Sequence, residues 1–190
     1  MNKNFAKVQL SAEEMRLVRD PAWILTKNSV MGKVVRMFGL LSEGWKEPKI
    51  SKGENYKGLP WVMLDYPRVF GKEDVYAIRT FFLWGHAFNV TLHLKGVYRE
   101  KFLPAVLARR AELADAGFEM SISDDEWAHE HTDDTYGPIE ERMRDGAAAG
   151  GRPWLKLSAR VGLEHWDEAP EKLFALHNLL MGVLSDEGDR

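Results

Sequence analysis

The densest group of potential metal ligands in the chain is Trp127-Ala-His129-Glu130-His131-Thr132-Asp133-Asp134. On an extended strand, His129 and His131 would share a face and could bind zinc or iron together with Asp133. The preceding Ser123-Asp-Asp-Glu126 has the pattern of a capping box, which favours a short helix over 124–131 instead. Residues two apart on a helix point about 200° from each other, so both histidines could not bind one ion there. We therefore predict no metal site and no cofactor, and keep a metal-dependent hydrolase using His129, His131 and Asp133 as an alternative.

Arg79 lies in the segment with the strongest pattern in the sequence, a β-hairpin. Residues 75–84 and 87–94 are rich in β-branched and aromatic side chains, and Gly85-His86 separates them. A two-residue loop that begins with glycine suits a type II′ turn. The resulting register pairs Leu83 with Phe88 and puts Arg79 on an apolar face with Phe81, Leu83, Val90 and Leu92.

A guanidinium on an apolar face needs a partner, because an unpaired buried charge is very costly. Asp65 or Glu119 could be that partner, which would make the pair structural. A ligand carboxylate or phosphate is the functional interpretation, since arginine recognises both in a bidentate manner. If the register is shifted by one residue, Arg79 is expected to be exposed and needs no such partner.

The other face of the predicted hairpin combines aromatic walls with hydrogen-bonding groups, as small-molecule pockets do. A partly solvated sheet has the same composition. Our candidate ligand-binding residues are Arg79, Thr80, Asn89, Thr91 and His93, next to the aromatic or apolar Tyr76, Ile78, Phe82 and Trp84. His177, by contrast, lies among apolar residues of a helix pattern, and we expect a core histidine bonded to the backbone.

Helices are predicted on both sides of this hairpin. Ser11-Ala-Glu-Glu14 is a capping box for a first helix that ends near Asp20. Asp20-Pro21 then caps a second helix, whose apolar residues recur up to Leu41 at spacings of three, four and seven. Further helices are expected over 98–116, 139–144 and about 168–184.

The remaining segments are predicted as strands or loops. Alternating patterns indicate strands at 118–122 and 154–161. Residues 42–60 are expected to form a surface loop, and 61–64 a strand or helix fragment that Asp65-Tyr-Pro-Arg68 interrupts. The Gly146–Gly151 tract is expected to be mobile. The predicted class is α+β: an antiparallel sheet around one hairpin, packed by N-terminal, middle and C-terminal helices.

Composition limits the functions that the chain can have. Its 190 residues include no cysteine, which excludes disulfides, thiolate metal sites and a cysteine nucleophile. The length suits a single domain over 1–190. Lys plus Arg number 26 against 29 for Asp plus Glu, so we expect no nucleic-acid partner. Apolar runs are too short for a membrane helix and no secretory signal is evident, so a cytoplasmic location is expected.

Charge is distributed unevenly along the chain. Residues 111–145 contain twelve acidic residues, whereas residues 1–60 carry eleven lysines or arginines against six acids. This asymmetry fits either a docking face or two halves that attract each other. Together with seven tryptophans, it keeps an interaction or scaffold role, including a homodimer, as a third hypothesis. The binding of a small anionic or amphipathic molecule is the interpretation we favour.

Overall fold

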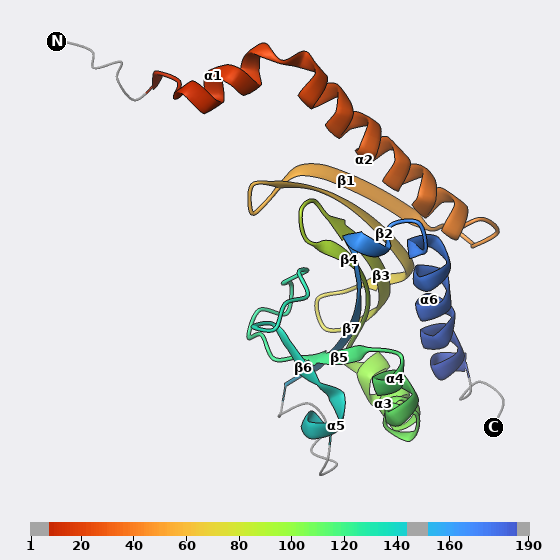
Figure 1. The fold of residues 1–190 in the computed structure, drawn as a ribbon. Helices are drawn as coiled ribbons and strands as arrows, with labels where there is room; N and C mark the ends of the chain where they lie inside the picture. Colours follow the sequence, from red (N-terminus) through yellow and green to blue (C-terminus); the bar gives the residue numbers. More distant parts are fainter. Residues whose placement is uncertain (1–7, 144–151, 186–190) are drawn as a thin grey trace.

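The fold is described by a computed structural model covering residues 8–143 and 152–185 (Figure 1). Within these residues, an antiparallel sheet of seven strands has the order β1-β2-β3-β4-β7-β5-β6. With its flanking helices, this sheet confirms the predicted α+β class. The strands are β1 (Lys49–Tyr56), β2 (Leu59–Phe70), β3 (Val75–Leu83), β4 (Ala87–Lys95), β5 (Phe118–Ser121), β6 (Tyr136–Pro138) and β7 (Trp154–Gly162).

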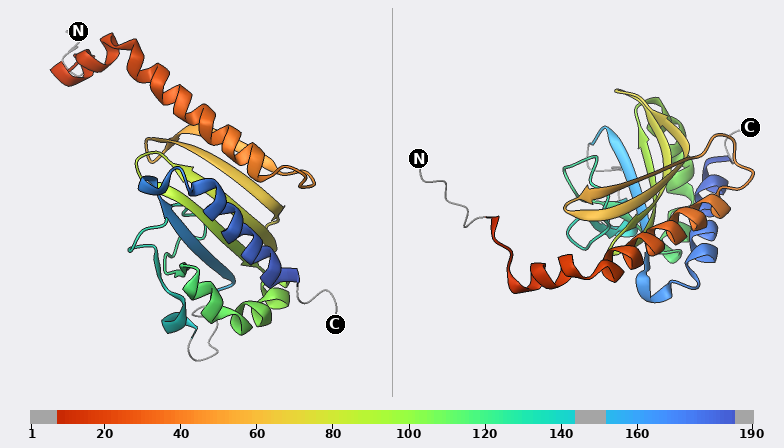
Figure 2. Two further views of the ribbon diagram at one scale, coloured as in Figure 1. Left: turned by 45° about the vertical axis from the view of Figure 1, so that its right-hand side comes forward. Right: turned by 90° about the horizontal axis from the view of Figure 1, so that it is seen from above.

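The helices gather on one face of the sheet, where the main core lies (Figure 2). Helix α2 (Pro21–Leu41) packs on β1 and β2, whereas α3 (Val97–Ala108) and α6 (Ala169–Ser185) pack on the central strands β3 and β4. Phe38, Phe82 and Leu157 are at most 2% exposed between these layers. Within the described residues, no helix has the length and apolar character needed to cross a membrane. The other helices are α1 (Ala12–Arg19), α4 (Arg110–Asp115) and α5 (Ile139–Arg142), with a 3-10 turn at Leu163–His165.

Both predicted N-terminal caps are confirmed. The Ser11 hydroxyl accepts the Glu14 amide of α1, and the Glu14 carboxylate accepts the Ser11 amide. The Asp20 carboxylate accepts the Ala22 amide and Pro21 is the first residue of α2. His177 is also placed as predicted: it is buried, with Nε2 at 2.8 Å from the Tyr66 carbonyl oxygen.

The predicted hairpin is present, but its register was wrong by one residue. Leu83 pairs with Ala87 and Phe82 with Phe88, so the loop has three residues, Trp84-Gly85-His86. Gly85 takes a left-handed φ of 73°, which glycine adopts without strain. Because side chains alternate along a strand, this shift transfers every side chain of β4 to the other face relative to β3. Arg79 therefore lies opposite Thr91 rather than among Val90 and Leu92.

The predicted loop over 42–60 is largely a strand. β1 forms one edge of the sheet, where charged residues such as Lys49 and Lys52 discourage pairing with other chains. Gly53 is required there, since a Cβ would lie 2.6 Å from the Trp61 indole. β2 also continues through the predicted break at 65–68, which the structure shows as a register shift in its pairing with β3.

Two helix predictions were also wrong in detail. No helix forms over 124–131; turns and bends occupy that stretch. The helix predicted over 98–116 is divided at Arg109 into α3 and α4. The short helix predicted over 139–144 is observed as α5, whereas the Gly146–Gly151 tract lies outside the described residues.

Candidate functional site

The face of the sheet that points away from α2 and α6 carries a row of polar residues. Five of these residues form one row across the sheet, each paired with the next on the neighbouring strand. From β2 through β3, β4 and β7 to β5 they are Asp65, Arg79, Thr91, Ser158 and Glu119. In the adjacent rows, Asn89 and the pair His93 and Lys156 share this face. Most of these side chains are buried, so they must find their hydrogen bonds inside the protein.

Residues 122–135, here called the cover segment, lie over this polar face (Figure 1). The segment is irregular, and its backbone is bonded to side chains of the sheet. Asn89 Nδ2 donates to the His129 carbonyl oxygen over 2.9 Å, and Lys156 Nζ donates to the Glu126 carbonyl oxygen over 2.9 Å. Lys156 also donates to the carbonyl of Ala128. The sheet side chains therefore determine where the cover segment lies.

Arg79 is paired with Asp65, one of the two carboxylates predicted for it. Arg79 Nε lies 2.7 Å from Asp65 Oδ1, and Nη2 lies 3.1 Å from Oδ2, which is a bidentate ion pair. On its other side, Arg79 Nη1 lies 3.2 Å from His129 Nδ1. Burial, and then the charge of Arg79, lower the pKa of His129 to about 3. The imidazole is therefore neutral at pH 7 and can accept from the guanidinium.

Lys156 is a buried cation of the site. It is 4% exposed, and within the described residues its hydrogen bonds go to two carbonyl oxygens rather than to a carboxylate, while the charges of Asp125, Glu126 and Glu130 act on it from further away. Burial, and then the charge of Arg79, lower its pKa to about 8. An ammonium has three N–H donors, so these two bonds leave one donor for the cavity that the side chain lines.

His93 and Glu126 form the next contact along β4. His93 Nε2 lies 3.1 Å from Glu126 Oε1, and Lys95 Nζ lies 3.0 Å from Glu126 Oε2. Burial, and then the charge of Lys156, lower the pKa of His93 to about 3. A neutral His93 that carries its proton on Nε2 can donate a hydrogen bond to Glu126 Oε1. Lys95 balances the charge of the same carboxylate.

A small cavity of about 10 Å³ lies between the sheet and the cover segment. This volume corresponds to about one water molecule. Phe70, at the end of β2, and Trp127 form its outer wall; their ring centroids are 6.4 Å apart and the side chains are 44% and 45% exposed. The cavity is lined by Phe70, Ala77, Arg79, Thr91, His93, Trp127, His129 and Lys156.

Glu130 anchors the middle of the cover segment to the β1–β2 hairpin. Its carboxylate accepts from the Tyr56 hydroxyl and from Lys57. Burial opposes ionisation of Glu130, but these two hydrogen bonds outweigh it and lower its pKa. The Lys57 contact joins the basic N-terminal part of the chain to its acidic middle part, as the charge asymmetry had suggested.

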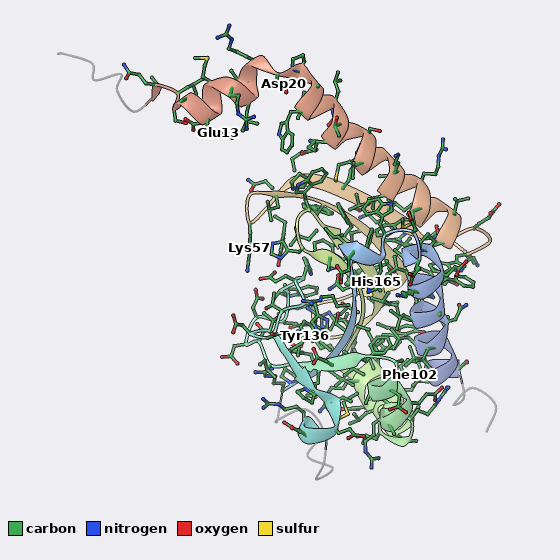
Figure 3. All side chains as sticks on the ribbon, viewed as in Figure 1. Glu13, Asp20, Lys57, Phe102, Tyr136 and His165 are labelled. Atoms are coloured by element: carbon green, nitrogen blue, oxygen red, sulfur yellow. The ribbon has the colours of Figure 1, made fainter. Side chains whose placement is uncertain are left out.

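The far end of the polar face is organised around His131 and Tyr136, of which Tyr136 is labelled in Figure 3. His131 Nε2 lies 2.7 Å from Glu119 Oε2, and its ring stacks on Tyr136 at 4.4 Å. The Tyr136 hydroxyl is buried beside Thr91 and Ser158 without completing a hydrogen bond of normal geometry. This burial raises the pKa of Tyr136.

Four of the five predicted ligand-binding residues share the polar face: Arg79, Asn89, Thr91 and His93. The fifth, Thr80, points to the helix side, because it pairs with Leu64 and Val90 of the main core. The one-residue register error had separated Arg79 from the other four. The structure thus changes the grouping while keeping most of the members.

The predicted metal candidates are not brought together. His129 contacts Arg79, His131 contacts Glu119, and Asp133 is exposed. Across residues 8–143 and 152–185, no group of three or more histidine or acidic side chains is arranged to hold a metal ion.

Sequence reasoning missed the outer wall and the second cation of the cavity. Lys156 was assigned to the polar side of a half-buried strand, and alternation alone cannot tell that this side is covered. Trp127 was placed in a helix that does not form. Phe70 lies two residues beyond the expected break at 65–68, so β2 was not expected to reach it.

Comparisons of the chain with protein-family models, with curated proteins and with solved structures found no match.

Proposed function

We propose that the protein binds a small molecule through an anionic group, which is held by Lys156 and Arg79 beneath Phe70 and Trp127. The observation that carries the proposal is the buried Lys156, which donates hydrogen bonds to carbonyl oxygens and, within the described residues, forms no ion pair with a carboxylate. Such a cation gains more from a ligand carboxylate or phosphate than a cation already paired with a carboxylate.

The surroundings of Lys156 support an anionic rather than a cationic ligand. Arg79 adds a second permanent positive charge, and the lowered pKa values of His93 and His129 leave both rings neutral. Neutral rings can donate or accept hydrogen bonds without repelling an anion or a cation. Asp65 compensates Arg79 from the opposite side of the guanidinium.

Entry of a ligand requires the outer wall to move. The present cavity holds about one water molecule. Phe70 ends its strand, and Trp127 lies in the irregular cover segment; both rings are close to half-exposed. An outward displacement of these two rings would create a slot with aromatic walls and a cationic floor, which suits an aryl or planar carboxylate.

Titration with benzoate, followed by amide NMR shifts, tests this proposal, with benzamide as the uncharged matched compound. We expect benzoate alone to shift residues of β3, β4, β7 and the cover segment. Binding should weaken above pH 8, because Lys156 then loses its charge. Lys156→Met should abolish these shifts, whereas Lys101→Met, on α3 outside the site, should not.

A Trp127→Ala variant covers the case in which the outer wall of Phe70 and Trp127 keeps benzoate out of the cavity. This substitution removes a half-exposed ring, so the fold should persist and small anions should enter more readily. If neither benzoate nor inorganic phosphate shifts these residues in the parent or in Trp127→Ala, the proposal is wrong and the polar layer is structural.

A further inference from the structure

The N-terminal part of the chain exposes an unusual amount of apolar surface. Residues 8–26, here called the arm, comprise α1 and the first turns of α2, and extend beyond the sheet (Figures 1 and 2). No residue of α1 is buried. Besides Val8 at its start, six large apolar side chains of the arm are between 44% and 71% exposed: Leu10, Met15, Val18, Trp23, Ile24 and Leu25. So much exposed apolar surface on one short segment is typical of an interaction site.

A second exposed apolar surface lies at the other end of α2. Here α2 and the start of α6 form a groove of about 430 Å³, with Met37, Leu40 and Phe174 among its apolar residues. Lys33 and Arg36 line its basic side, and Glu171 lies on the α6 side. The arm is an apolar helical ridge, so the two surfaces are complementary in character.

We propose that the arm of one copy occupies the groove of a second copy, and that two such contacts form a symmetric dimer. The charges of the arm match those of the groove. The first turn of α1 carries Glu13 and Glu14, which suit Lys33 and Arg36, and its last turn carries Arg16 and Arg19, which suit Glu171.

The arm cannot reach the groove of its own chain. Arm and groove lie at opposite ends of the continuous helix α2. Fifteen residues separate Leu25 from Leu40, which is about 22 Å along a rigid α-helix. Intramolecular contact would require α2 to break, whereas a second copy can present its groove without any such change. Only a second copy can therefore bring an arm to this groove.

The apolar area available is sufficient for a stable contact. With about 200 Å² for a large apolar side chain and about half of it exposed, six arm residues offer roughly 600 Å². Two arms together then bury roughly 1,200 Å² of their own surface, to which the grooves add their part, and this reaches the size range of a stable protein interface. A lipid surface is a poorer match, because the arm (residues 8–26) has three acids and two bases and hence no basic excess.

Sedimentation equilibrium over a wide concentration range tests the proposal through two variants. An arm variant, Ile24→Glu/Leu25→Glu, and a groove variant, Leu40→Glu/Phe174→Glu, should each raise the dimer dissociation constant by about tenfold or more. Val97→Glu, at an exposed apolar residue of α3, is the matched control and should sediment like the parent. Circular dichroism confirms that each variant is folded, since all five residues are exposed.

Mixing the two variants distinguishes this exchange from other modes of association. The arm variant retains its groove and the groove variant retains its arm, so the mixture should form a heterodimer through one intact contact. Direct arm–arm pairing would leave the groove variant dimeric alone and would overturn the proposal. A parent chain that stays monomeric would also overturn the dimer proposal. If this monomer floats with phosphatidylserine vesicles, the arm binds a lipid surface instead.

Discussion

At the scale of single residues, the polar face depends on the protonation of two buried histidines. Burial lowers the pKa values of His93 and His129 from 6.5 to about 3. As pH falls from 6.5 toward 3, the unfolded chain therefore binds protons that the folded chain refuses, and the free energy of unfolding decreases. We expect the imidazole NMR signals of both residues to remain those of the neutral ring at pH 5.

Urea unfolding at a series of pH values gives the matching stability measurement. His129→Gln keeps an acceptor for Arg79 but cannot titrate, so its stability should depend less on pH below 6.5 than that of the parent. His86→Gln, at the exposed hairpin loop, should follow the parent. A normal titration of His129 near pH 6.5 would show that its ring is solvated.

The Arg79–Asp65 ion pair is a second test at this scale. Asp65 is 5% exposed, and Arg79→Met would leave its carboxylate buried without the guanidinium. Removing one member of a buried pair typically costs about 3–5 kcal/mol. We expect a loss of this order from Arg79→Met in urea unfolding. The double variant Arg79→Met/Asp65→Leu should be more stable than either single variant, and additive losses would contradict the pairing.

These residues also show what the sequence could and could not predict. Asp65 was named as a possible partner of Arg79 because a guanidinium on an apolar face needs a carboxylate or a bound anion, although the register behind that argument was wrong by one residue. Lys156 was not recognised as a site residue, because its burial is caused by the cover segment and not by any pattern within its own strand. Irregular segments have no periodicity, so their position over a sheet cannot be predicted from alternation.

At the scale of elements, those with a strong apolar pattern were predicted correctly, whereas the edge strand β1 was not. Apolar periodicity marks five elements whose apolar residues pack in the main core, namely β3, β4, β7, α2 and α6. β1 has charges and a glycine because it is an edge strand, and such a composition resembles a loop. The β3–β4 register depended on whether the loop had two or three residues. The composition around Gly85 is compatible with both loop lengths.

The cover segment should respond to the loss of its anchor. Glu130→Ala removes the contacts with Tyr56 and Lys57, at an expected cost of about 1–3 kcal/mol. Amide hydrogen exchange should become faster over residues 126–133 while β4 and β7 remain protected. Glu141→Ala, at an exposed residue of α5, serves as the control. Unchanged exchange would mean that the carbonyl contacts of Lys156 and Asn89 hold the segment without Glu130.

At the scale of the whole molecule, one sheet separates two interiors that are stabilised differently. The helix side is an apolar core, whereas the other side is a hydrogen-bonded polar layer with a small apolar cluster of Met63, Phe81 and Leu83. Adjacent residues of β7 sample both interiors: Leu157 and Ser158 are each 0% exposed but point to opposite sides. The same strand thus allows the two kinds of burial to be compared directly.

Leu157→Ala and Ser158→Ala should therefore differ in magnitude and in cause. Leu157→Ala leaves a cavity in the apolar core and should lower the free energy of unfolding by about 2–5 kcal/mol. Ser158→Ala removes a 2.9 Å hydroxyl contact with Thr91 and a longer one of 3.5 Å with the Asn89 amide, for which about 1 kcal/mol is expected. Urea unfolding measures both, and NMR shift changes should appear on the helix side for the first variant and near Thr91 and Tyr136 for the second. Equal losses would mean that the polar layer contributes to stability as strongly as the apolar core.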